Sequence, residues 1–388
     1  MAEDLLFPVS VVGSWPRPAW LIQALRRRQA GDSSFDEFNQ IADDAVLAAV
    51  KYQEDAGVDI LTDGEQRRDN FYSFVVEKLQ GIKLMTMTQL LDHMKDRASF
   101  EETLRALDVP SFAMKSPVAV EHVTSKTDLA RDELEFVKAH SKKRVKVPLP
   151  GPYMLTRSSW FPGLSDSAYP EIEDLGQVIS KILHHELLRL KEAGVDFVQL
   201  DEPVLSQVVH GAEGAETFMC AALASRRDPT EELTYAQELV NQTVKGISGI
   251  KLGIHVCRGN WSRKEDVLLK GNYGPLLPYL TEMKVDQLVL EFATPRAGEL
   301  RVFKEYGDDK ELGLGVVNPR SSEVENPHVI EKKVQEALKF FDPSKLYLNP
   351  DCGFGTFAER PVNDTRTAYA KLQAISKAAK GLRESVNN

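Results

Sequence analysis

The chain has few of the features that would place it in a membrane or outside the cell. Only three cysteines occur in its 388 residues, which is too few for a disulfide framework in a chain of this length. No apolar run approaches the ~18–20 residues that a membrane-spanning helix needs. The N-terminal stretch MAEDLLFPVSVVGSW has neither a basic segment nor a cleavage-like site. We therefore expect a cytoplasmic protein with no membrane partner.

An excess of basic residues is also missing. Lysine and arginine number 48 against 58 aspartates and glutamates, giving a formal net charge of −10. Nucleic acids and anionic surfaces favour basic patches, so neither is predicted as a partner. The 42% of hydrophobic residues is enough to bury a large core. Because α/β barrels often exceed 250 residues as one unit, we predict a single catalytic domain over residues 1–388.

Short apolar runs alternate with longer helical patterns, which is typical of βα units around a parallel sheet. Nine runs are predicted as strands: Val9–Gly13, Ile60–Glu65, Val118–Val123, Arg144–Leu149, Phe197–Asp201, Leu252–Val256, Leu288–Phe292, Leu312–Val317 and Leu346–Asp351. Helices are predicted over Ile41–Ala56, Asp128–His140, Glu171–Ala193, Thr230–Ile247, His328–Phe340 and Val362–Ala378.

The number of strands favours an eight-stranded (β/α)8 TIM barrel with one strand left over. Val118–Val123 follows a long polar stretch rather than a compact helix, so we assign it to an excursion between barrel strands two and three, at about residues 83–123. A doubly wound open sheet is the alternative. Polar residues follow eight of the predicted strands, and in a barrel these positions meet at the carboxyl-terminal rim, where active sites lie.

One group of strand ends carries metal-binding chemistry. His255 and Cys257 are two residues apart at the end of an apolar strand, so their side chains point the same way. Glu291 ends the next predicted strand and Cys352 follows the last one. One imidazole, two thiolates and a carboxylate suit tetrahedral zinc. Glu291 can instead be a carboxylate that orients His255 without touching the metal. Cys220, within an apolar run, is predicted as a core residue.

From VVGSWPRP to LYLNPDCGFGTF, these motifs resemble the catalytic C-terminal half of cobalamin-independent methionine synthases, in a short form with one barrel. The resemblance implies zinc as cofactor, with His255, Cys257, Glu291 and Cys352 as ligands. It also implies that Ser14, Glu65 and Asp201 bind homocysteine. Two carboxylates are suited to hold the substrate ammonium group. Their structural alternative is to cap the helix that follows each of them.

The implied reaction is transfer of a methyl group to the thiol of homocysteine, giving methionine. Because a free thiol has a pKa near ~8.5, coordination to zinc would make the thiolate available at neutral pH. The methyl donor is predicted to be a methyl-folate or a methyl-corrinoid, the latter on a corrinoid protein.

Two departures from the long family members bear on the donor. Arg320 occupies the segment after strand seven where they carry a histidine suited to protonating a departing amine. The segment after Gly151-Pro152 ends in Trp160 and also differs from theirs. Both departures weaken the prediction of methyl-folate as the donor, and neither changes a residue that is predicted to bind the thiol or the metal.

Two other functions remain open at this stage. One is a zinc-dependent thiol alkyltransferase acting on another small thiol, such as coenzyme M with an epoxide. Four arginines could serve the anionic group of such a substrate: Arg17, Arg67, Arg68 and Arg320. The other is a non-catalytic protein that binds zinc or a small molecule. A metal set at a barrel mouth argues against a purely structural zinc, which is usually enclosed.

Overall fold

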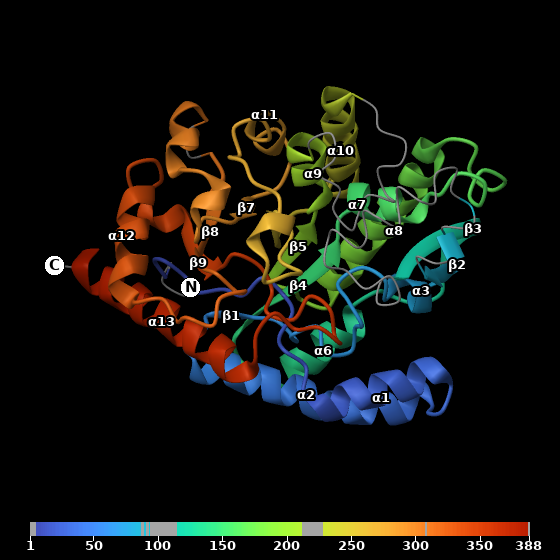
Figure 1. Ribbon diagram of the computed structural model, residues 1–388, viewed down its shortest axis with the longest axis horizontal. Helices are drawn as coiled ribbons and strands as arrows, with labels where there is room; N and C mark the ends of the chain where they lie inside the picture. Colours follow the sequence, from blue (N-terminus) through green and yellow to red (C-terminus); the bar gives the residue numbers. More distant parts are fainter. Residues whose placement is uncertain are drawn as a thin grey trace.

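Seven parallel strands form the central sheet of the computed structural model, which describes residues 5–86, 89–90, 93, 115–211, 228–306 and 309–386 (Figure 1). In their order across the sheet the strands are β1 (Ile60–Leu61), β4 (Arg144–Pro150), β5 (Phe197–Asp201), β6 (Lys251–Val256), β7 (Gln287–Leu290), β8 (Glu311–Val317) and β9 (Leu346–Pro350). Each strand pairs in parallel with its neighbour in this order.

The N-terminal segment joins the two edges of this sheet. Val9 forms a parallel bridge with Leu348 of β9, and Ser10 forms one with Ile60 of β1. The backbone amide of Ser10 donates to the carbonyl of Leu348 at 2.9 Å. Residues 9–10 therefore stand in the place of an eighth strand and close the ring, which confirms the predicted TIM barrel. The strands predicted over Val9–Gly13 and Ile60–Glu65 are shorter, because their last residues turn into the rim.

Helices cover the outside of the ring, as the periodic apolar stripes predict. The longer ones are α1 (Ala19–Ala30), α2 (Phe35–Asp55), α6 (Arg131–His140), α8 (Ile172–Glu192), α10 (Pro229–Thr243), α12 (Pro327–Ala337) and α13 (Thr365–Val386). The shorter ones are α3 (Val75–Lys78), α7 (Pro152–Ser159), α9 (Val204–His210) and α11 (Leu277–Leu280). In α8 the predicted stripe is buried at Leu175, Ile179 and Leu183. Within the described residues, no helix is long and apolar enough to cross a membrane.

The predicted excursion is a separate antiparallel pair beside the barrel (Figure 1). It consists of β2 (Leu79–Thr86) and β3 (Lys115–Ser125), which lie between β1 and β4 in the chain. Val118–Val123 belongs to β3 and takes no part in the central sheet, as predicted. Much of the connection between β2 and β3, and Cys220 with its prediction as a core residue, lie outside the described residues.

Candidate active site and metal centre

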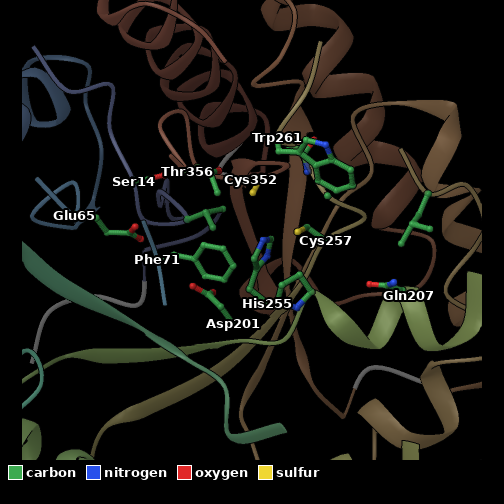
Figure 2. A pocket seen from close by; sticks show the side chains of 16 residues that line it. Ser14, Glu65, Phe71, Asp201, Gln207, His255, Cys257, Trp261, Cys352 and Thr356 are labelled. Carbon is green, nitrogen blue, oxygen red and sulfur yellow. The ribbon is translucent and has the colours of Figure 1, made fainter. Parts of the chain in front are cut away.

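The three strongest metal-ligand candidates meet at the carboxyl ends of β6 and β9. The imidazole of His255 and the sulfurs of Cys257 and Cys352 all lie within 4.8 Å of one another. Figure 2 shows both sulfurs on the side of the pocket towards which the imidazole extends. All three residues are buried. The structure thus brings together three of the four residues predicted to hold zinc, from strands that are not neighbours in the sheet.

A backbone carbonyl of the neighbouring strand fixes the orientation of the His255 imidazole. Its Nδ1 lies 3.0 Å from the backbone carbonyl oxygen of Val289 on β7, which makes Nδ1 the protonated nitrogen. Nε2, the other ring nitrogen, is buried and has no hydrogen-bond partner. A histidine that binds a metal through one ring nitrogen commonly donates the N–H of the other nitrogen to a carbonyl oxygen in this way. The unpartnered nitrogen beside two sulfurs fits a soft metal such as zinc.

The electrostatics of the cluster favour a bound negative charge on sulfur. The neighbouring Cys352 sulfur is the main cause that holds the pKa of Cys257 well below its usual range. Burial by itself lowers the pKa of His255, but the nearby Cys257 sulfur reverses this and raises that pKa to about 9. Proximity to Cys257 in turn raises the pKa of Cys352 well above its usual range. Of the two cysteines, Cys257 is therefore the one that more readily becomes a thiolate.

Glu291, the fourth predicted ligand, lies outside this three-residue cluster. It is completely buried, and its Oε1 accepts a hydrogen bond from the side-chain amide of Asn260. Its Oε2 lies 3.5 Å from the Arg296 guanidinium and 3.9 Å from that of Arg258. These partners neutralise the carboxylate and hold it in place. Glu291 would have to give up this arrangement to bind a metal beside Cys352.

Glu65 is placed in the pocket by a strained turn after β1. Its φ of 53° lies in the left-handed region, which is uncommon for a residue with a side chain. Arg17 stabilises this turn, because its Nη2 donates to the Glu65 carbonyl at 2.6 Å. Oε2 of Glu65 is buried and has no hydrogen-bond partner. Burial raises the pKa of this carboxyl to about 8, although the nearby charges of Arg68 and Arg17 oppose the shift.

Asp201 ends β5 and lines the same pocket, below Phe71 in Figure 2. Its Oδ1 accepts a hydrogen bond from the Gln199 side chain at 2.7 Å. Burial raises the pKa of Asp201 to about 6, despite the opposing influence of His255. The carboxyl group beside it in the sequence, Glu202, accepts from the amides of Tyr153 and Met154 and so caps α7. Asp201 has no such capping role.

Ser14 follows the N-terminal segment and completes the polar wall. Its Oγ accepts from the amide of Gly355 at 3.3 Å, and its carbonyl oxygen accepts from the amide of Phe354. These bonds join the first and last rim turns of the ring. The Ser14 hydroxyl proton remains available for an acceptor in the pocket.

The structure brings all three predicted substrate residues together with the three candidate metal ligands. One pocket is lined by Ser14, Glu65 and Asp201 and also by His255, Cys257 and Cys352. Sequence reasoning missed several further wall residues, among them Phe71, Gln207 and Trp261. Trp261 was within reach of that reasoning, because it follows His255-Val256-Cys257 directly in Arg-Gly-Asn-Trp. Phe71 and Gln207 carry no local signal.

The four rim arginines considered for an anionic group all have partners in the scaffold. Arg17 donates to Gly355 and Glu65, Arg67 pairs with Asp43, and Arg68 pairs with Glu133. Arg320 donates to Asn260 at 2.9 Å and pairs with Glu265 at 2.6 Å. These arginines therefore give no support to a substrate such as coenzyme M. Trp160 donates to the carbonyl of Tyr169 and does not line the pocket.

Comparison with known proteins gives a consistent family. The model of the cobalamin-independent synthase catalytic domain matches residues 7–380. A methionine synthase of Saccharolobus islandicus is 31% identical, over 100% of this chain and 98% of its own length. A methionine synthase of Sulfurisphaera tokodaii is 29% identical, over 100% of this chain and 96% of its own.

Solved structures show the same fold. A B12-independent methionine synthase from Shewanella sp. W3-18-1, in complex with selenomethionine, superposes with a TM-score of 0.74. The alignment covers 98% of this chain and 99% of that one, at 21% identity. At this identity the likeness establishes the barrel architecture and leaves the chemistry to the residues.

Proposed function

Because the chain belongs to the cobalamin-independent synthase family and is an enzyme of the methyltransferase class, we propose that it methylates the thiol of homocysteine to form methionine. The observation that carries this proposal is the composition of one pocket. Three candidate metal ligands, one imidazole nitrogen and two cysteine sulfurs, lie beside two buried carboxyl groups, Glu65 and Asp201. An amino-acid thiol presents the complementary pair of groups, a sulfur and an ammonium.

We propose zinc as the metal, held by His255, Cys257 and Cys352. The unpartnered Nε2 of His255 and two adjacent sulfurs supply three ligands of the tetrahedral set that zinc prefers. Zinc bound there would supply a Lewis-acidic centre that keeps a coordinated thiol deprotonated near neutral pH. Glu291 stays a prediction as the fourth ligand, in competition with its bond from Asn260.

The chain's own residues would bind and orient the amino-acid part of the substrate. Glu65 and Asp201 receive the ammonium group, which offsets the desolvation that raises the pKa of each carboxyl. The Ser14 hydroxyl donates to the substrate carboxylate. Holding both charged groups on the α-carbon directs the thiol at the other end of the molecule towards the His255–Cys257–Cys352 cluster, which supplies the positioning on which transfer rates depend.

The donor is a methyl-folate or a methyl-corrinoid, and we propose that the corrinoid reacts faster. Loss of folate nitrogen as a leaving group requires a proton, and general-acid help is worth ~10²–10⁴ in rate. Among the described residues that line the pocket, the only histidine is His255. Arg320 is buried, paired and a poor acid. A methyl group on cobalt leaves without protonation of the corrinoid.

The test is to incubate the zinc-loaded protein with homocysteine and methylcobalamin, or with methyl-tetrahydrofolate at the same concentration, and to measure methionine by mass spectrometry. We expect methionine from both donors, with a higher initial rate from methylcobalamin. A higher rate from methyl-folate would overturn the donor proposal. If neither donor gives methionine, while the metal protein alkylates coenzyme M with an epoxide, the proposed substrate is wrong.

A further inference from the structure

A lysine is buried inside the barrel, below the carboxyl groups of Glu65 and Asp201 that are proposed to bind the substrate. Lys146 on β4 is 1% exposed, and the two polar residues above it on β5, Gln199 and Asp201, are 0% and 6% exposed. Gln199 and Asp201 are two residues apart on one strand, so both point into the ring. The three side chains form one line from the interior of the barrel to the pocket. Nothing in the proposed reaction uses Lys146.

The surroundings of Lys146 differ from those of an ordinary buried lysine. Lys371 on α13 is equally buried and ends in an ion pair with Glu325 at 2.7 Å. Lys146 instead donates to a neutral group, the Oε1 of Gln199, at 2.9 Å, and lies 5.0 Å from the centre of the Phe197 ring. Burial lowers the pKa of Lys146 to about 7. Because an unpaired buried amine costs stability, an apolar residue would suit this position better if only packing mattered.

The hydrogen bond from Lys146 fixes the orientation of the Gln199 amide. Since the lysine donates, Gln199 must turn its oxygen towards it. Its Nε2 then faces the pocket and donates to Oδ1 of Asp201 at 2.7 Å and to the carbonyl of Val12 at 3.1 Å. Both hydrogens of the amide are used. A flipped amide would instead place its oxygen against two acceptors.

This arrangement acts on the free oxygen of Asp201. With Oδ1 occupied by an N–H donor, the carboxyl group is held as an acceptor and its orientation is fixed. No hydrogen bond to Oδ2 occurs among the described residues, and Asp201 lines the pocket. A flipped Gln199 would favour protonation or rotation of Asp201, and either change would remove an acceptor for a substrate cation.

We propose that Lys146 is a positioning residue for substrate recognition: through Gln199 it holds Asp201 as an acceptor for the ammonium group of the amino-acid thiol. This inference rests on the proposed function, since it assigns the ammonium group to Asp201. Lys146 touches neither the substrate nor the metal. It selects for the amine of the substrate and does not act on its sulfur.

The test compares binding of homocysteine with that of 4-mercaptobutanoate, which lacks the amine, by calorimetry on the zinc-loaded protein. We expect Lys146→Met to weaken homocysteine binding by about tenfold and to leave 4-mercaptobutanoate binding unchanged. In an Asp201→Asn background the same substitution adds no further loss, because both changes remove one interaction. Lys371→Met is the matched control, with reduced thermal stability and unchanged preference for the amine.

A second variant covers the case in which Lys146→Met does not fold. Gln199→Glu keeps an acceptor for Lys146 but removes the donor to Asp201, so the same selective loss of homocysteine binding is expected. Equal weakening for both thiols, or unchanged homocysteine binding in the folded variant, would overturn the inference. Binding is measured without turnover, so this outcome is separate from a failure of the wild type to form methionine, which would overturn the proposed function.

Discussion

At the scale of single residues, two buried atoms of the pocket lack hydrogen-bond partners. His255 Nε2 and Glu65 Oε2 are both enclosed by protein and make no hydrogen bond. An unsatisfied buried polar atom costs on the order of 1–3 kcal/mol. Both atoms therefore lower the stability of the folded protein, and a cation next to each of them would remove this cost. A metal ion at the first and a substrate ammonium at the second are the two cations proposed here.

Replacing either cysteine of the cluster should remove the metal. We expect about one zinc per chain in the wild type, and Cys257→Ser or Cys352→Ser to lose most of it, because thiolates dominate zinc affinity at such sites. Metal analysis of the purified variants by mass spectrometry measures this. Glu291→Gln serves as a comparison: retained zinc would place Glu291 outside the ligand set, and full zinc in both serine variants would contradict the site.

Glu65→Gln should raise the stability of the folded protein and lower its affinity for the substrate. The folded pKa of about 8 lies above the usual 4.5, so the carboxyl binds more protons folded than unfolded. Its charge therefore destabilises the fold increasingly as pH rises from 4.5 to 8. We expect the empty variant to melt at a higher temperature than the wild type at pH 8, with little difference near pH 4.5.

The same Glu65→Gln variant should bind homocysteine about ten- to a hundredfold more weakly, because it loses a charge-assisted hydrogen bond. Thermal melts at two pH values, together with calorimetry, separate the two effects. Unchanged homocysteine affinity would make Glu65 a scaffold residue, whatever the effect on melting.

At the scale of elements, the turns after the strands fit together by contacts that leave no room for a side chain. A Cβ on Gly13 would collide with Oε1 of Glu65, and one on Gly353 would collide with Oγ of Ser14. These glycines come from turns at opposite ends of the sequence. Close approach of backbone to functional side chain thus sets the width of the substrate end of the pocket.

Gly13→Ala should displace the Glu65 carboxyl and leave the metal cluster in place. The added methyl group meets Glu65 and the side chain of Pro148, both of which lie away from Cys257 and Cys352. We expect the KM for homocysteine to rise about tenfold or more with zinc content unchanged. Steady-state kinetics and metal analysis on one preparation test this. Loss of zinc together with substrate affinity would indicate a wider disturbance of the rim.

At the scale of the whole molecule, the ring is closed by the first described residues and held by the last helix. Arg383 of α13 donates to the carbonyls of Leu6 and Phe7 and pairs with Asp59 at 2.8 Å. The same Asp59 oxygen accepts from the amide of Val9. The C-terminal helix therefore fixes the segment that bridges β9 to β1. Ser14 follows that segment, so closure of the ring also positions the substrate wall.

Arg383→Ala should loosen this closure. It leaves the carbonyls of Leu6 and Phe7 without this donor and removes the ion pair of Asp59, which keeps its bond from Val9. We expect a cost of about 1–3 kcal/mol, which corresponds to a melting temperature lower by several degrees. Lys380→Ala, at an exposed position of the same helix, is the control and should melt as the wild type does. Scanning calorimetry of both variants decides the point. Equal melting of the two would show that the N-terminal segment is held by its bridges alone.

The sequence by itself determined the barrel and the candidate functional residues at its rim. Alternating apolar runs and helical stripes are local signals, so they revealed seven strands, the leftover strand in β3 and the main helices. The spacing of His255 and Cys257 placed two candidate ligands on one face, and the family motifs added Cys352 as a third. Each of these inferences needed only residues near one another in the chain or a recurring motif.

The tertiary structure decided what depends on residues distant in sequence. Glu291 was predicted within the strand that became β7 and lies just after it, where Asn260 and two arginines hold it outside the group formed by His255, Cys257 and Cys352. Phe71 and Gln207 reach the pocket from loop and helix positions that no local pattern marks. Lys146 reads as an ordinary strand residue until the ring closes around it and excludes water. Partners, burial and charge are properties of the closed barrel, because they arise only when separate strands converge.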